Sequence, residues 1–264
     1  AVALPEEGQH LREAGIEAPI LVLGLIQPEE AWKVVASRLD QTVSSIALLE
    51  ALDREAGSVS IQVNVHVKVE TGLGRIGVEP HEVAPFLRRA RSYRNLKVAG
   101  LFSHFSAADE RDKTFARHQL QLFEQTIREI QHAGIELPQR HMANSAATLD
   151  LPESYYDLVR PGLIIYGLYP STEVSHSIEV KPAMTLRTGV CYLKTVPQGT
   201  PISYGRTFVT QKQTRVATLP LGYCDGYKRA LANKGEVLIK GRRAPVIGRI
   251  CMDMCMIDVS DVPD

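Results

Sequence analysis

The sequence has no net charge, no long apolar run and no closely paired cysteines, and each absence excludes a class of function. Thirty Lys and Arg residues balance thirty Asp and Glu residues, so no long-range field attracts nucleic acid or an anionic membrane. Apolar runs such as residues 20–25 end far short of the roughly 20 residues that cross a bilayer. We therefore expect a small neutral or zwitterionic ligand as the partner, with no nucleic acid and no membrane.

Residues 1–7 lack the basic and then apolar layout of a secretory signal, which favours a cytoplasmic protein. The cysteines include no CxxC pair, and the sequence around them offers no His or Cys to complete a metal site. We expect no metal and interpret the cysteines as buried free thiols. They are Cys191, Cys224, Cys251 and Cys255.

Strand-like apolar runs alternate with helix-period segments over the first two thirds of the chain. This alternation predicts βα units around a parallel sheet. The six expected strands lie at residues 20–25, 42–45, 61–69, 98–102, 139–142 and 158–160. The clearest helix is expected at residues 113–133, where one apolar stripe recurs at helical spacing and Gly134 ends it.

After Pro170 the chain becomes rich in Val, Thr and Gly, with frequent turns. Strands are expected there at residues 186–196, 215–219, 236–239, 244–247 and 254–259. The sequence therefore predicts two domains, an α/β domain over residues 1–169 and a mostly β domain over residues 170–264, with the end of the second domain incomplete.

The segment 61–69 helps to choose between an eight-stranded (β/α)8 barrel and an open, doubly wound sheet. Its odd positions are Ile or Val, whereas its even positions from 62 to 70 are all polar. Strands of an open doubly wound sheet are covered on both faces and tend to be apolar throughout. A barrel strand can turn one polar face into the lumen near the active-site end. We expect a TIM-type barrel whose first two units precede Ala1.

Gly72, Gly74 and Gly77 match the dinucleotide-binding pattern GxGxxG. A Rossmann site requires a helix at the third glycine and an acidic residue at the end of the next strand. Here Pro80 intervenes and the next strand carries no acid. A nucleotide-binding module is therefore the least favoured interpretation.

Taken as a whole, residues 66–77, HVKVETGLGRIG, resemble the alanine racemase segment HxKxDTGMxRLG. The resemblance implies that Arg75 contacts both the phenolic oxygen of pyridoxal phosphate and the substrate carboxylate. It gives Lys68 a supporting role as a lysine that is often carbamylated. Carbamylation would convert this cation into an anion that can pair with Arg75.

Two further barrel segments resemble the same family. Residues 103–110, SHFSAADE, follow the strand at 98–102 and place His104 at the mouth of the barrel. Asn144-Ser145 and the segment Arg160-Pro161-Gly162-Leu163 follow the seventh and eighth strands of an eight-unit count, where barrel phosphate sites are typically built. The resemblance assigns His104, Asn144, Ser145, Gly162 and Leu163 to cofactor binding, and Arg160 to the pyridine nitrogen.

The β domain carries three more matching segments, ISYGRTF at 202–208, PLGYCDGY at 220–227 and GRICMD at 248–253. The resemblance implies that Tyr204 is a catalytic base acting across a homodimer interface, and that Tyr223 and Met252 of the same subunit help to form the substrate pocket. Racemisation needs acid and base groups on both faces of a planar carbanion. Positive charge relayed through His104 and Arg160 would lower the ordinary tyrosine pKa of about 10.

The resemblance therefore implies a pyridoxal-phosphate-dependent racemase that interconverts L-alanine and D-alanine and supplies D-alanine for cell-wall synthesis. A racemase of broader specificity and a non-catalytic pyridoxal-phosphate-binding barrel remain alternatives. The family's Schiff-base lysine lies in a segment resembling AVVKANAYGHG, and no such segment occurs here. We expect a polypeptide limited to these residues to be inactive alone.

Overall fold

The computed structural model describes residues 1–263, which form two compact units that divide between Met184 and Thr185. The sequence pattern changes earlier, at residues 169–170. Each unit is described by itself below. No helix within residues 1–263 combines the length and hydropathy needed to cross a membrane.

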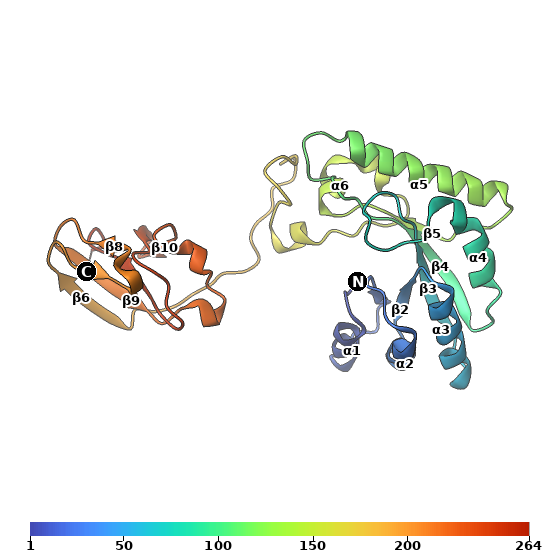
Figure 1. Ribbon diagram of the computed structural model, residues 1–264, viewed down its shortest axis with the longest axis horizontal. Coiled ribbons are helices and arrows are strands. Elements are labelled where there is room, and N and C mark those ends of the chain that lie inside the picture. The colour runs from blue at the N-terminus through green and yellow to red at the C-terminus, as the bar shows by residue number, and fades with distance from the viewer. Residues whose placement is uncertain (264) are drawn as a thin grey trace. The chain divides into compact units, whose positions relative to one another are not determined.

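The first unit is built on a five-stranded parallel sheet whose strands follow one another in chain order, β1-β2-β3-β4-β5 (Figure 1). A doubly wound sheet reverses its strand order at a switch point, whereas a barrel adds each strand beside the last. The sequential order confirms the barrel class. The strands are β1 Leu21–Val22, β2 Asp40–Val43, β3 Val63–Lys68, β4 Leu96–Phe102 and β5 Gln139–His141.

The strand expected at residues 158–160 is not formed. Asp157 N donates to Arg140 O at 3.0 Å and Arg160 N donates to Ala143 O at 2.9 Å, so this segment runs beside the end of β5. Tyr156, just before the segment, has a left-handed backbone, and Pro161 follows it directly. These two residues limit the length of extended backbone. These two hydrogen bonds to the end of β5 do not make the evenly spaced ladder of a parallel strand pair. The prediction of a strand at residues 158–160 was therefore wrong.

The helices of the first unit pack on the sheet and bury one face each. The predicted helix at 113–133 is confirmed as α5, Thr114–His132, and Gly134 follows it with φ +69°. Its buried stripe comprises Ala116, Leu120, Phe123, Ile127 and Ile130. The other helices are α1 Pro5–Glu13, α2 Ala31–Ala36, α3 Ile46–Ser58, α4 Val83–Arg91 and α6 Ser145–Asp150.

Strand β3 carries both the core and the polar groups of the site. Val63, Val65 and Val67 are buried in the main apolar cluster, while His66 and Lys68 on the alternate face are also buried. The register with β4 shifts at Val65/His66, and His66 lies directly against Gly100. A Cβ at position 100 would lie 2.0 Å from His66 Nδ1, so only glycine fits beside this histidine.

The second unit is a set of small antiparallel sheets, ordered β12-β9-β6, β10-β11 and β7-β8. Each of the five predicted strands overlaps an observed one. The two-residue strands β7 and β8 were not predicted, because their turn-rich sequence carries little periodicity. The strands are β6 Tyr192–Val196, β7 Pro201–Ile202, β8 Phe208–Val209, β9 Thr214–Leu219, β10 Glu236–Ile239, β11 Arg242–Pro245 and β12 Cys255–Asp258.

All four cysteines are free, but they are not all buried. Cys255 is buried within β12 and Cys251 is half-buried, whereas Cys191 and Cys224 are exposed. Cys191 directly precedes the edge strand β6, and Cys224 lies in a surface turn. The expectation of buried thiols was therefore wrong for Cys191 and Cys224, whose small apolar side chains need not be inside.

Candidate active site

A half-buried arginine, Arg160, lies at the centre of the polar groups in the first unit. Arg160 Nη2 donates to Ser103 O at 2.7 Å and to Met142 O at 3.2 Å, just beyond the carboxyl ends of β4 and β5. Nη1 contacts His141 Nδ1 at 2.5 Å, and Nη2 lies 3.5 Å from His104 Nδ1. Nε is buried and has no hydrogen-bond partner. Catalytic groups of barrel enzymes occur at this end of the strands.

Burial and the charge of this arginine together keep His104, the histidine beside it, neutral. Burial lowers the pKa of Arg160 to about 10, so the guanidinium stays cationic near neutral pH. Burial, followed by the charges of Arg160, Arg75 and Lys68, lowers the pKa of His104 to about 4. His104 is therefore a neutral imidazole, and its Nδ1 accepts because a guanidinium can only donate.

Lys68 ends β3 with its side chain buried, and Nζ donates to Ile76 O at 2.6 Å. Burial, opposed by the charge of Glu70 and assisted by those of Arg75 and Arg160, lowers its pKa to about 8. A lysine with this pKa exposes a neutral, nucleophilic amine to a useful extent near neutral pH. Lys68 is thus a reactive amine within a cationic environment.

The glycine-rich segment is a loop that folds back on β3. Glu70 accepts hydrogen bonds from the backbone N–H groups of Gly72, Leu73 and Arg75 at 2.6, 2.7 and 3.3 Å. Burial opposes the ionisation of Glu70, but backbone hydrogen bonds leave its pKa lowered overall. The loop presents Arg75 with an exposed side chain. Arg75 and His104 both line a cleft of about 970 Å³.

Gly77 closes this loop at a point where no side chain fits. Its φ is +147°, and an added Cβ would lie 2.6 Å from Glu70 N. We expect Gly77→Ala to lower the free energy of unfolding of the first unit by about 1–3 kcal/mol. Gly134→Ala is the matched control, because Gly134 has φ +69° but nothing within 4 Å. Urea unfolding followed by Trp32 fluorescence measures both, and an equal loss in the two variants would contradict the steric argument.

Asn144, Ser145 and Gly162 are brought together as the sequence predicts. Asn144 caps α6 by accepting from Ala147 N at 3.0 Å. Ser145 Oγ accepts from Gly162 N at 2.8 Å and from Ile164 N at 3.4 Å. Leu163 lies between those two amides with 47% of its surface exposed. Two backbone N–H groups therefore meet at the Ser145 hydroxyl, and anion sites are typically built from groups of these kinds.

In the second unit, Tyr204 lies on a turn with an unusual backbone. Ser203 has φ 64° and ψ −178°, a region that is essentially restricted to glycine. Its hydroxyl donates to Arg249 O at 2.6 Å, which links this turn to the segment 248–253. Tyr204 is 70% exposed. The strained turn thus presents a tyrosine hydroxyl outward from its unit.

Tyr223 and Met252 are held in two neighbouring loops. Tyr223 N donates to Cys251 O at 3.1 Å and Cys224 N donates to Met252 O at 2.9 Å. Gly222 permits this approach, since a Cβ there would lie 2.0 Å from Met252 O. The three β-domain segments that carry Tyr204, Tyr223 and Met252 therefore meet at one face of the second unit.

Sequence reasoning missed the roles of two buried histidines and a half-buried aspartate behind Arg160. His66 and His141 join Arg160 in a line of contacts, and Asp40 lies at its far end. A signal was present: His66 lies on the polar face of the strand at 61–69, and His141 lies at the end of the strand at 139–142. Neither position reveals a partner, because contacts between different strands depend on sheet register.

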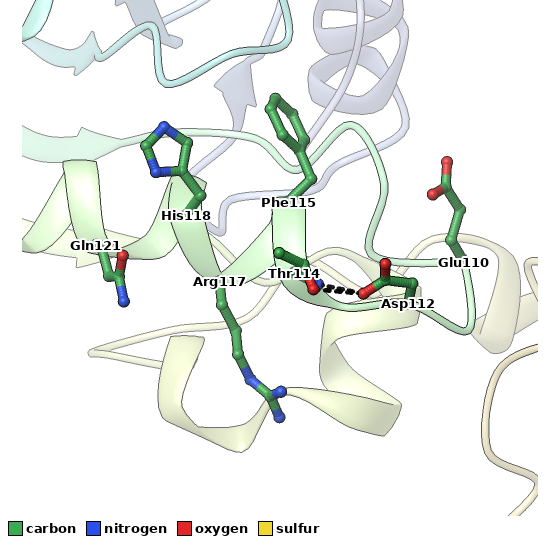
Figure 2. Close-up of a pocket in the computed structure, with 7 residues that line it drawn as sticks. All are labelled: Glu110, Asp112, Thr114, Phe115, Arg117, His118 and Gln121. Carbon is green, nitrogen blue, oxygen red and sulfur yellow. Dashed lines mark hydrogen bonds between the residues drawn. The ribbon is translucent and has the colours of Figure 1, made fainter.

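A separate pocket lies at the start of α5 (Figure 2). Asp112 accepts hydrogen bonds from both N and Oγ1 of Thr114 at 2.9 and 2.6 Å. Figure 2 shows Phe115 and His118 pointing to one side and Arg117 to the other. None of the residues that line this pocket is among the predicted site residues, so we assign it no part in the chemistry.

The sequential parallel sheet, the cationic cluster at the carboxyl ends of its strands and the antiparallel second unit define a barrel enzyme with a β domain. Residues 1–170 match the family described as "Alanine racemase, N-terminal domain", and residues 183–264 match "Alanine racemase, C-terminal domain". The chain belongs to the alanine racemase family.

Individual relatives agree with this assignment over the whole chain. The alanine racemase of Halothermothrix orenii is 46% identical over 264 residues, which are 100% of this chain and 70% of that protein. The structure of alanine racemase from Clostridium difficile 630 matches with a TM-score of 0.94 at 35% identity, covering 100% of this chain and 69% of that one. A complex of that racemase with cycloserine matches with a TM-score of 0.90 at 33% identity, covering 100% and 68%.

Proposed function

We propose that the protein containing this chain is a pyridoxal-phosphate-dependent alanine racemase that interconverts L-alanine and D-alanine. The observation that carries the proposal is Arg160, a half-buried cation whose buried Nε has no hydrogen-bond partner, at the carboxyl ends of the strands. Family membership places the activity among the isomerases. The general role of the family, D-alanine supply for the cell wall, makes the cytoplasm the proposed location.

The residues present fit the cofactor. Arg160 Nε is a buried donor that requires an acceptor, and a pyridine nitrogen is an acceptor of the right kind. Asn144, Ser145, Gly162 and Leu163 would hold the phosphate group near the converging amides. When bound, the cofactor stabilises negative charge at the α carbon of an amino acid. An arginine opposite its nitrogen disfavours ring protonation, which suits proton exchange with few side reactions.

Arg75 and Lys68 would hold the substrate side of the cofactor. Arg75 projects into the cleft that it shares with His104 and offers a guanidinium to a carboxylate or phenolic oxygen. Lys68 supplies an amine whose lowered pKa suits addition to carbon dioxide. The neutral amine would form an N–C bond to carbon dioxide and release one N–H proton to solvent, and the resulting carbamate anion could fix Arg75.

Carbamylation of Lys68 can be measured directly. We expect protein equilibrated with ¹³C-bicarbonate to show a carbamate carbon signal that is lost in Lys68→Met. Lys97→Met is the control, because Lys97 is an exposed lysine on β4. The signal should grow as the pH rises through about 8, where the Lys68 amine loses its proton. A signal retained in Lys68→Met would contradict the assignment.

Tyr204 would act as one of the two acid and base groups, delivered from the partner subunit of a homodimer. Its exposed position on the strained turn suits a residue that serves a site outside its own unit. Tyr223 and Met252, on the adjoining loops, would contribute to the substrate pocket. His104 and Arg160 would support the tyrosine hydroxyl through the neutral imidazole and the guanidinium charge.

The test is a racemisation assay on the protein containing these residues, with pyridoxal phosphate added. Conversion of D-alanine to L-alanine, and the reverse, supports the proposal. Comparable rates with bulkier amino acids would favour the broad-specificity alternative. Cofactor binding without conversion of any amino acid would contradict the proposed activity and favour a non-catalytic binding protein.

A further inference from the structure

A line of four side chains begins next to Arg160 and runs through His141, His66, Asp40 and Asn64. The two histidines are buried, and Asp40 and Asn64 are half-buried. Arg160 Nη1 lies 2.5 Å from His141 Nδ1, and His141 Nε2 lies 2.9 Å from His66 Nδ1. His66 Nε2 faces Asp40 Oδ2 at 3.9 Å, and Asp40 Oδ1 accepts from Asn64 Nδ2 at 3.0 Å. The line crosses the sheet from the end of β5 through β3 to the start of β2.

The chemistry of the groups fixes the direction of this line. A guanidinium has donors only, so His141 Nδ1 must accept. His141 then carries its proton on Nε2 and donates to His66 Nδ1, which leaves the His66 proton on Nε2, facing Asp40. Every proton therefore points away from Arg160 and towards the carboxylate.

The surroundings hold both imidazoles in place. His66 and His141 are 6% and 0% exposed. The ring of His141 stacks on Phe102 with centroids 4.7 Å apart, and Arg160 Cζ lies 5.1 Å from the same Phe102 ring. Gly100 leaves the space that the His66 ring fills. A buried histidine that only satisfies its own hydrogen bond would not need the burial, the stacking on Phe102 and the space beside Gly100 together.

We propose that His66 and His141 form a directional hydrogen-bonded pair of neutral imidazoles, with the Asp40 carboxylate facing its far end, and that this arrangement positions Arg160 with its Nε free for the cofactor. These three are positioning residues. The inference deepens the proposed function and rests on it for the identity of the group that Nε meets.

Within residues 1–263, the recorded hydrogen-bond partners of Arg160 are imidazoles and backbone carbonyls, and the neutral spacers explain this arrangement. A carboxylate beside a guanidinium forms two parallel hydrogen bonds and engages two of its nitrogens. An imidazole nitrogen accepts a single bond, so His141 fixes Nη1 and leaves Nε available. The Asp40 carboxylate faces the far end of the chain at 3.9 Å from His66 Nε2, where its charge favours a proton on that nitrogen without competing for the cofactor's donor.

The first experiment measures the tautomers without any cofactor. Protein labelled with ¹⁵N-histidine should show His66 and His141 as neutral rings with the proton on Nε2 from about pH 6 to pH 8, because both have strongly lowered pKa values. A cationic ring, or a proton on Nδ1 of either residue, would overturn the proposal. His66→Gln and His141→Gln assign the two signals.

The second experiment measures the position of Arg160 through the hydrogen exchange of its Nε–H. We expect His66→Leu to accelerate this exchange about tenfold while amide exchange in α5 stays unchanged. His66→Gln should restore slow exchange, because its amide can accept from His141 and donate towards Asp40. His81→Gln, an exposed histidine, is the control.

An unchanged Arg160 signal in folded His66→Leu would overturn the proposal, as would acceleration shared equally by α5, which indicates only a structural role. If His66→Leu does not fold, Asp40→Ala replaces it with the same expected acceleration. Neither experiment uses cofactor or substrate, so a failure of the proposed function would leave both results unchanged.

Discussion

Replacing Tyr204 with phenylalanine is expected to lower kcat for alanine racemisation by about 10²- to 10⁴-fold, the range that a positioned acid or base contributes. The change removes one hydroxyl from a residue that is 70% exposed on its unit, so the fold should be unaffected. Steady-state assays in both directions, with circular dichroism as a folding check, make the measurement.

The matched control is Tyr192→Phe, which removes the hydroxyl of another exposed tyrosine in the same unit. It should leave kcat unchanged. Loss of activity confined to Tyr204→Phe would identify the hydroxyl as the group that matters. If Tyr204→Phe retained full activity in both directions, the assignment of Tyr204 as an acid or base would be wrong.

Acid is expected to destabilise the first unit through three neutral histidines. Burial, followed by the charge of Arg160, lowers the pKa of His66 and His104 to about 4 and of His141 to about 2. Unfolded histidine has a pKa of about 6.5, so below that pH the unfolded chain binds protons that the folded chain cannot. Between about pH 7.5 and pH 5 each histidine should cost about 2 kcal/mol of stability, or about 6 kcal/mol together.

Urea unfolding at both pH values, followed by the fluorescence of Trp32, the single tryptophan, measures this loss. His104→Asn should reduce the loss to about 4 kcal/mol, because one of the three histidines is removed. His81→Gln should leave it unchanged, and the comparison cancels the carboxylates common to all three proteins. A loss of the same size in His104→Asn and the parent would show that His104 is not held neutral by the fold.

Periodicity predicted the parts of the fold that depend on burial of one face. The alternation in residues 61–69 distinguished a barrel strand from a doubly wound one, and β3 does bury valines on one side and His66 and Lys68 on the other. The stripe of α5 was equally clear. These elements bury side chains at regular intervals, so the apolar periodicity can be detected within a short stretch of sequence.

Short segments whose structure depends on one or two backbone pairings could not be predicted from periodicity. The segment 158–160 is apolar enough for a strand, but its flanking backbone geometry prevents a ladder. Strands β7 and β8 are two residues long and are held by their pairing alone. Local sequence carries no information about such pairing, because the partners lie elsewhere in the chain.

The candidate site also contains residues that could be predicted from the sequence and residues that could not. Motif resemblance selected Arg160, His104, Lys68 and the residues around Ser145, and the structure brings these together within the first unit. It included His66 as the first residue of the segment 66–77 without giving it a role, and it did not select His141 or Asp40, because these roles arise from register across three strands. A chain of contacts that crosses a sheet becomes visible only when the register is known.

The close approach of His66 to Gly100 also limits the order in which this sequence can change. A side chain at position 100 would occupy the space of the imidazole, so Gly100→Ala in the presence of His66 meets a steric barrier. If position 66 first becomes small, the same alanine fills a void instead of creating a clash. The order of substitutions therefore becomes irreversible. Once an alanine occupies position 100, a histidine can no longer fit at position 66. The contacts between Asp40 and Arg160 that pass through His66 are then lost.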